Sequence, residues 1–139
     1  MNSIEDAVQL FESGYVCSQA VFAAFSQDFD LSKEQALKIG ACFGSGMRKA
    51  EVCGACTGAL MALGLKFGEN KEKSNEVCVR FMDEFKKENG SYVCRDLLKC
   101  DISTPEGVKY AKDNNLFTEF CPKMVESAAR ITEEILSSE

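Results

Sequence analysis

Residues 52–60 read Val52-Cys53-Gly54-Ala55-Cys56-Thr57-Gly58-Ala59-Leu60 and mark the start of a helix. Small side chains in the first two turns let the backbones of neighbouring helices approach closely. The apolar run that follows extends this predicted helix over residues 54–67. Two cysteines three positions apart at its start allow three alternatives: a redox centre, a pair of metal ligands, or a seam of small residues between helices.

Helical patterns continue on both sides of this stretch. Ser3 is expected to cap a first helix, and Ser32 with Gln35 forms a capping box for a third. Residues 44–51 are expected to form a loop. We predict an all-α protein, a single compact bundle of six to seven helices with residues 1–139 as one domain. The predicted helices cover residues 3–13, 16–29, 33–43, 54–67, 70–89 and 121–136, and one more is expected to start at Thr104-Pro105. Residues 94–98 are expected to form only a short helical turn.

The composition excludes some classes of partner. With 139 residues, 45% hydrophobic and 27% charged, the chain has the balance of a globular protein with a full core. Its net charge of −6 argues against nucleic acid or an anionic membrane surface as the main partner. We find no targeting or membrane-inserting pattern and expect a cytoplasmic location, where thiols are kept reduced.

Cysteine is abundant in this chain and histidine is absent. The eight cysteines come with no histidine, which excludes a Cys-His nucleophile pair, a Ser-His-Asp triad and every histidine-containing zinc site. Any metal would therefore be held by thiolates, with or without carboxylates. A nucleophilic cysteine would need activation by a helix end or by a nearby cation.

Four cysteines share a position at the start of a predicted helix. Free backbone N–H groups and the helix dipole stabilise a thiolate there, so we expect a lowered thiol pKa and a reactive or metal-binding sulfur. The four are Cys17, Cys53, Cys94 and Cys121.

The other cysteines are placed differently. Cys56 lies one helical turn after Cys53, and a CxxC pair at a helix start is typical of dithiol oxidoreductases, in which one thiol attacks and the other resolves. No βαβ pattern supports a thioredoxin fold. Cys42 and Cys78 lie among apolar residues and are expected to be small buried side chains, whereas the pattern leaves the role of Cys100 open.

The motif carries a family resemblance. The string Cys53-Gly54-Ala55-Cys56-Thr57-Gly58 is followed by "GLKFG", by "CRDLL" and by a cysteine before the last helix. Over residues 11–136 the chain resembles the C-GCAxxG-C-C family, whose members are described as redox-active helical proteins with four characteristic cysteines. The resemblance assigns these to Cys17, Cys53, Cys94 and Cys121, and Gly54, Ala55 and Gly58 complete the motif as candidate cofactor-binding positions. Cys56 falls on a variable motif position, so the family pattern does not require a Cys53–Cys56 mechanism.

Three hypotheses for the function follow. The first is a thiol-disulfide oxidoreductase or electron-transfer protein, in which Cys53 reacts and Cys17, Cys94, Cys121 or Cys56 resolves. The second is a metal or iron–sulfur cluster held by Cys17, Cys53, Cys94 and Cys121, and the third is a helical module with structural cysteines. The partner would be a redox protein or a small molecule, and family members encoded near transporters imply a transporter association. The sequence leaves open whether the chain forms an oligomer.

Overall fold

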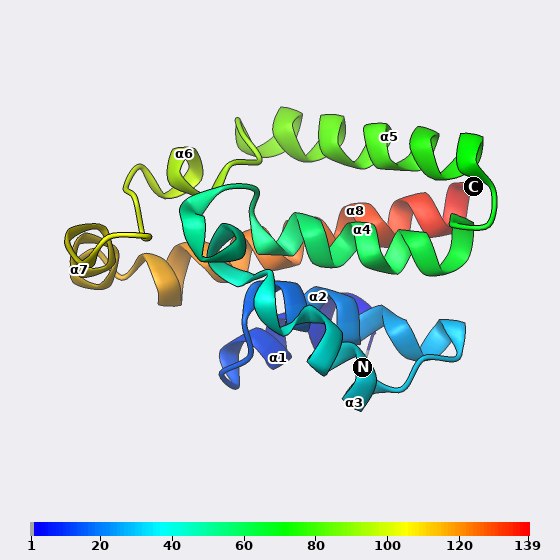
Figure 1. The fold of residues 1–139 in the computed structure, drawn as a ribbon, viewed down its shortest axis with the longest axis horizontal. Coiled ribbons are helices and arrows are strands. Elements are labelled where there is room, and N and C mark those ends of the chain that lie inside the picture. Colours follow the sequence, from blue (N-terminus) through cyan, green and yellow to red (C-terminus); the bar gives the residue numbers. More distant parts are fainter. Residues whose placement is uncertain (1) are drawn as a thin grey trace.

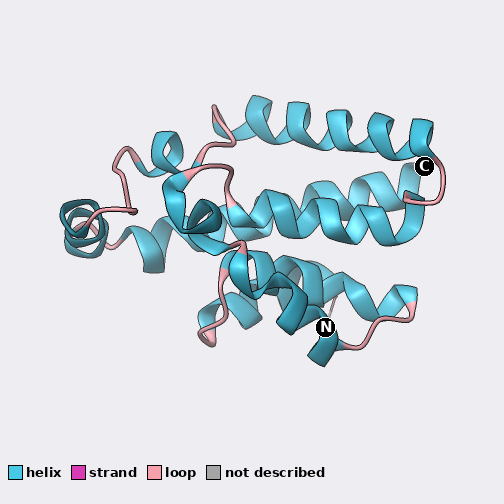
Figure 2. Ribbon diagram, viewed as in Figure 1, coloured by secondary structure: helices cyan, strands magenta, loops and turns pink. Residues whose placement is uncertain are grey.

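The computed structural model describes residues 2–139, and eight α-helices account for most of them (Figures 1 and 2). This confirms the all-α prediction. The count exceeds the expected six to seven because the short segment after residue 93 forms a helix of its own. The helices are α1 (Ser3–Glu12), α2 (Cys17–Ser26), α3 (Lys33–Ile39), α4 (Gly54–Phe67), α5 (Lys71–Asn89), α6 (Cys94–Leu98), α7 (Pro105–Asp113) and α8 (Cys121–Ser138).

Four short helical turns connect these helices. They are η1 (Gln27–Phe29), η2 (Gly40–Cys42), η3 (Gly46–Ala50) and η4 (Leu116–Phe120). The third predicted helix ends earlier than expected, at Ile39, and continues as η2. Residues 44–51, expected as a loop, contain η3.

The helices are arranged in layers (Figure 1). Helix α5 covers one side, α4 and α8 lie in the middle, and α1, α2 and α3 lie on the other side. Helices α6 and α7 extend from one end of these layers. Helix α4 contacts α2, α5 and α8, so the helix that begins at the opening motif lies at the centre of the protein.

The core is built from aromatic and aliphatic side chains on four helices. Phe25 of α2, Leu63 of α4 and Ile135 of α8 are almost fully buried. Two aromatic rings of α5, Phe81 and Phe85, join them with their centroids 6.0 Å apart. Because this burial removes apolar surface from water, it supplies the main favourable free energy of folding.

Close contact between α2 and α4 depends on glycine. A Cβ built on Gly58 would lie 2.6 Å from the carbonyl oxygen of Ser18, closer than real Cβ atoms approach. The hydroxyl of the same Ser18 donates a 2.6 Å hydrogen bond to the carbonyl of Gly40. The small residues of the opening motif therefore bring α2, α4 and η2 together, as the sequence predicts.

Helix caps were predicted with mixed success. The Ser32 hydroxyl accepts a hydrogen bond from the N–H of Gln35 at 3.1 Å, which confirms the cap of α3. The prediction of Ser3 as the first cap was wrong, because Asn2 accepts from the N–H of Glu5 at 2.8 Å and Ser3 is already helical. Either side chain can satisfy a free N–H, so the pattern alone does not choose between adjacent caps.

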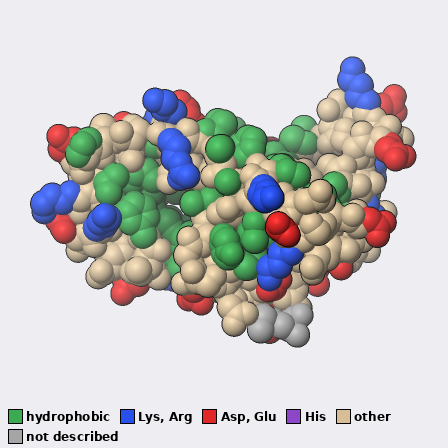
Figure 3. Space-filling model, turned by 60° about the horizontal axis from the view of Figure 1, so that its bottom comes forward, with side chains coloured by type: hydrophobic (Ala, Val, Ile, Leu, Met, Phe, Trp, Pro, Cys, Tyr) green, Lys and Arg blue, Asp and Glu red, His purple; other side chains and the backbone are tan. Residues whose placement is uncertain are grey.

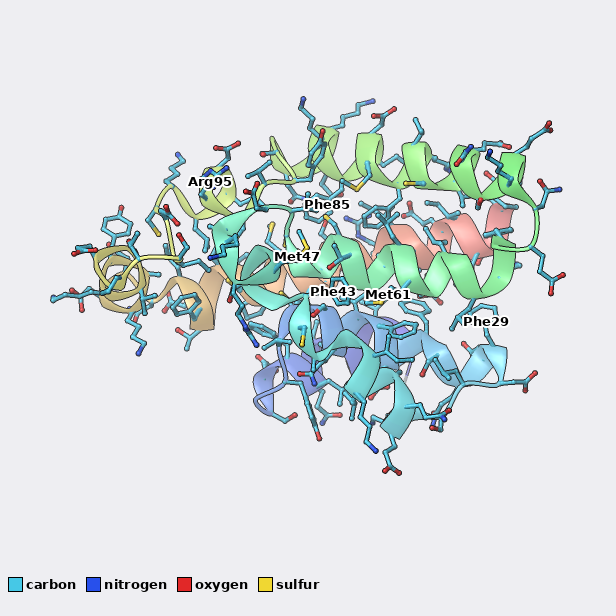
Figure 4. All side chains as sticks on the ribbon, in the orientation of Figure 1. Phe29, Phe43, Met47, Met61, Phe85 and Arg95 are labelled. Atoms are coloured by element: carbon cyan, nitrogen blue, oxygen red, sulfur yellow. The ribbon has the colours of Figure 1, made fainter. Side chains whose placement is uncertain are left out.

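The turn before α4 has an unusual backbone. Ser45, Gly46, Met47 and Arg48 all have positive φ angles between 55° and 63°, so the turn is left-handed. Residues other than glycine rarely adopt this conformation, and each of them destabilises the folded protein by about 1–3 kcal/mol. The Glu51 N–H closes the turn with a 3.2 Å hydrogen bond to the carbonyl of Gly46. Figure 4 shows Met47 beside the start of α4, where this turn leads the chain into the helix.

The glycine contact predicts opposite outcomes for two substitutions in α4. Gly58→Ala should destabilise the protein by about 1–3 kcal/mol, because the new methyl group meets the backbone of α2. Gly64→Ala has no atom within 4 Å of its Cβ and should stabilise the helix by about 0.5–1 kcal/mol. Urea unfolding of both variants measures the difference, and equal effects would contradict the proposed contact.

Candidate functional site: a cavity lined by four cysteines

The four cysteines singled out in the sequence do lie at helix starts. Cys17, Cys94 and Cys121 are the first residues of α2, α6 and α8, and Cys53 is the N-cap residue of α4. The N-cap residue of α8 is Phe120, so Cys121 is already helical. Each sulfur therefore comes from a different helix.

All four cysteines line one cavity of about 530 Å³. The walls come from the connection between α1 and α2, the start of α4, helix α6, turn η4 and the start of α8. Most of the other lining side chains are apolar, and toward the end of the molecule that holds α7, apolar side chains gather around a hollow in the surface (Figure 3). The lining includes Phe11, Tyr15, Val16, Leu97, Leu98, Ile102, Phe117, Phe120, Pro122 and Met124.

Two of the cysteines are tied together by the backbone. Val52 and Val93 form an isolated antiparallel bridge, and each directly precedes a cysteine. The Cys53 N–H donates to the carbonyl of Tyr92 at 2.8 Å, and the Cys94 N–H donates to the carbonyl of Glu51 at 2.5 Å. The starts of α4 and α6 are therefore held side by side, although 41 positions separate their cysteines.

An exposed ion pair supports this junction. Arg95 of α6 lies 3.4 Å from a carboxylate oxygen of Glu51 and also donates to the carbonyl of Lys49 at 3.4 Å. Figure 4 shows Arg95 on α6 beside the η3 turn. Solvent screens a pair of this kind, so we expect a contribution of about 0–1 kcal/mol.

Three thiols are close neighbours. Cys53 interacts with Cys17 on one side and with Cys56 on the other, and these interactions shift the thiol pKa values. Cys17 lies on the cavity wall, whereas Cys56 is fully buried and does not line the cavity. Cys53 thus has two neighbouring thiols, one from α2 and one from its own helix.

Backbone groups hold the first two sulfurs in place. The N–H groups of Ser18 and Ser45 donate to Cys17 Sγ, and the N–H of Ala55 donates to Cys53 Sγ. A Cβ on Gly54 would lie 2.4 Å from Cys17 Sγ. The sulfur of Cys17 therefore occupies the space that the missing side chain of Gly54 leaves. The strained turn at Ser45 supplies one of its donors.

The expectation that helix starts lower the pKa of these thiols was wrong. The hydrogen bond to Cys53 and burial raise the pKa of Cys17 well above its usual value. For Cys53, the hydrogen bond from Cys17 lowers the pKa, but the bond to Cys56 and burial outweigh it and raise the pKa overall. Burial, followed by the neighbouring cysteines, raises the pKa of Cys94 and Cys121 to about 12. The loss of hydration on burial therefore raises the pKa of these thiols more than the helix dipole lowers it.

The small residues of the motif pack against neighbouring helices or against the cavity. Gly54 lines the cavity, whereas Ala55 and Gly58 are buried between helices and do not line it. The prediction that Cys42 is buried was wrong, because helix α3 ends before it and leaves it exposed in η2. Cys78 and Cys100 are each half-buried and lie outside the cavity lining.

The aromatic residues of the cavity were not found from the sequence. Phe117 and Phe120 belong to η4, and Tyr15 lies in the connection between α1 and α2. Single aromatic residues in short connections have no periodic signal, so only their tertiary positions place them in one wall. Glu12 is the one charged residue in the lining that the structure describes.

The cysteine arrangement does not fit a metal centre. Across residues 2–139, no group of three or more Cys, Asp, Glu or His side chains is placed to hold a metal ion. All eight cysteines are free thiols. A four-cysteine metal or cluster site requires sulfurs arranged around one centre.

Fold and site together define an all-helical protein with four helix-start thiols around an apolar cavity. The model of a family described as "Putative redox-active protein (C_GCAxxG_C_C)" matches residues 15–135, so the chain belongs to this family. No curated protein and no solved structure matches the chain. None of the helices within residues 2–139 has the length and apolarity required to span a bilayer.

The raised pKa values predict loss of stability at alkaline pH. Cys94 and Cys121 titrate near 9 when unfolded and at about 12 when folded. The folded state therefore holds more protons above pH 9, so their contribution to stability is complete below pH 9 and is lost as pH rises toward 12. Urea unfolding with a reductant present should show this decline.

Cysteine variants test whether these two thiols cause the loss of stability at alkaline pH. Cys94→Ala and Cys121→Ala should flatten the alkaline decline, whereas Cys42→Ala, at an exposed position, should leave its slope unchanged. An unchanged slope in the first two variants would contradict the assignment of the raised pKa values to these buried thiols.

Proposed function

We propose that this protein is a thiol–disulfide redox protein in which Cys17 and Cys53 form a reversible disulfide. The observation that carries the proposal is the adjacency of the two sulfurs at the wall of a cavity that a small molecule can occupy. Each sulfur comes from a different helix, and α2 and α4 are held together through Gly58. The two thiols are therefore already adjacent before any bond forms.

The surroundings of the two thiols suggest different roles for them. The neighbouring Cys17 lowers the pKa of Cys53, and so does the N–H of Ala55, whereas the interaction with Cys53 raises the pKa of Cys17. Negative charge is therefore stabilised on Cys53 when the pair loses a proton. Cys53 is then the attacking thiolate, and Cys17 is the thiol that resolves the intermediate.

Cys56 is the competing partner of Cys53. It is fully buried and does not line the cavity, and its interaction with Cys53 raises the pKa of Cys53. Cys17 lines the cavity together with Cys53, so the proposal favours Cys17 over Cys56 as the resolving thiol.

Cys94 and Cys121 are proposed as a second dithiol in the same cavity. After burial, Cys17 and Cys100 raise the pKa of both thiols by proximity, and Cys94 also raises the pKa of Cys121. A disulfide formed at Cys17–Cys53 can pass to this pair by thiol–disulfide exchange, in which one thiolate attacks a disulfide sulfur and another sulfur leaves.

Thiol counting under anaerobic conditions tests the proposal. Fully reduced protein treated with one equivalent of a mild diazene oxidant should lose two thiols reversibly, and peptide mapping at early times should link Cys17 to Cys53. Cys53→Ser should abolish this loss, while Cys42→Ser and Cys78→Ser should leave it intact because both lie outside the cavity. Eight thiols that remain unreactive in the folded protein would overturn the proposal.

The substitution Gly54→Ala tests whether the two sulfurs must be adjacent, without replacing either cysteine. The added methyl group would lie 2.4 Å from Cys17 Sγ, so the sulfur must move away from Cys53. We expect the rate of Cys17–Cys53 disulfide formation to fall by about tenfold or more, as misplacement of about 1 Å does for reacting groups. Gly64→Ala in the same helix is the control, because its Cβ meets no other atom within 4 Å. Equal rates in both variants would argue against the pair.

A further inference from the structure

The cavity restricts which electron acceptor can reach the thiol pair. The exposed fraction is 8% for Cys53 and 7% for Cys94. A disulfide on the surface of another protein must approach a sulfur in line, and burial of this degree prevents that approach in the folded chain. The cavity itself, at about 530 Å³, is within the range typical of sites for small molecules.

The chemistry of the walls selects a neutral apolar molecule. Two phenylalanines of η4, Phe117 and Phe120, face the cavity together with Phe11 and Tyr15. Within the described chain no lysine or arginine lines it, and the single charged lining residue, Glu12, is acidic. An anionic acceptor such as glutathione disulfide would therefore lose hydration without gaining a cationic partner. A flat apolar ring would instead stack on aromatic side chains.

We propose that the cavity binds a neutral quinone as the two-electron acceptor of the Cys17–Cys53 pair. This rests on the proposed function, and it names the substrate class. A quinone combines the neutral apolar ring that these walls favour with the ability to take two electrons and two protons. Those are the electrons and protons that a dithiol releases on forming a disulfide.

The proposed step balances in atoms and electrons. The Cys53 thiolate adds to a ring carbon of the quinone, which forms an S–C bond and moves an electron pair onto a carbonyl oxygen. Cys17 then attacks Cys53 Sγ, so the S–S bond forms as the S–C bond breaks. The ring keeps the electron pair of the broken bond and becomes the hydroquinone. The two protons from the thiols end on its two oxygens.

Duroquinone is a suitable probe because its four methyl groups block permanent addition of a thiol to the ring. Reduced full-length protein carrying Cys42→Ser is mixed with duroquinone without oxygen, and quinone absorbance and remaining thiols are followed together. We expect one quinone reduced for every two thiols lost, with the disulfide mapped to residues 17 and 53. Cys17→Ser and Cys53→Ser should abolish this reaction.

A cavity variant separates binding from thiol chemistry. Phe117→Lys places an ammonium group in the apolar wall and should slow duroquinone reduction by about tenfold or more. Phe117→Leu is the matched control and should retain most of the rate. Urea unfolding and far-ultraviolet circular dichroism of both variants should match those of the unsubstituted protein, which shows that each is folded.

The outcomes separate this proposal from the proposed function. If glutathione disulfide oxidises the pair faster than duroquinone, or if Phe117→Lys leaves duroquinone reduction unchanged, the quinone proposal is overturned and the dithiol function stands. If no oxidant produces a loss of two thiols that depends on Cys53, both are overturned.

Discussion

The close approach of α2 and α4 is the contact on which the site depends. Gly58 lets the two backbones meet at Ser18, and Gly54 leaves the space that Cys17 Sγ fills. A side chain at either position would separate the helices or displace the sulfur. The same two glycines therefore set both the packing at the centre of the protein and the distance between the first two thiols. Structural and chemical requirements meet in one short stretch of sequence.

Much of the fold followed from local patterns in the sequence. Helix α4 was predicted with its observed bounds, and the cap at Ser32 was found, because both depend on residues close together in the chain. The η3 turn was not predicted, since Met47 and Arg48 have no intrinsic preference for positive φ. Their conformation is imposed by the hydrogen bond from Glu51 and by the hydrogen bond that Ser45 gives to Cys17.

The positions of the four cysteines at helix starts were predicted, but their electrostatics were not. Helix position and family motif both selected the four cysteines that line the cavity, because an N-terminal position can be recognised from local caps and breaks. Burial depends on tertiary packing, so the raised pKa of Cys53 and the aromatic wall at Phe117 and Phe120 had no local signal. The exposed position of Cys42 followed from the early end of α3, which the apolar pattern did not reveal.

The cavity draws its cysteines from four helices spread over residues 17–121, and this affects the chain while it is being made. Helix α8 packs against α1, so the cavity is complete only after helices far apart in the sequence have met. Until then the thiols are exposed to water, have an ordinary pKa and are more reactive than in the folded protein. Eight cysteines allow on the order of a hundred complete pairings. Newly made chains are therefore most vulnerable to wrong disulfides before α8 docks, and a reducing environment matters most at that stage.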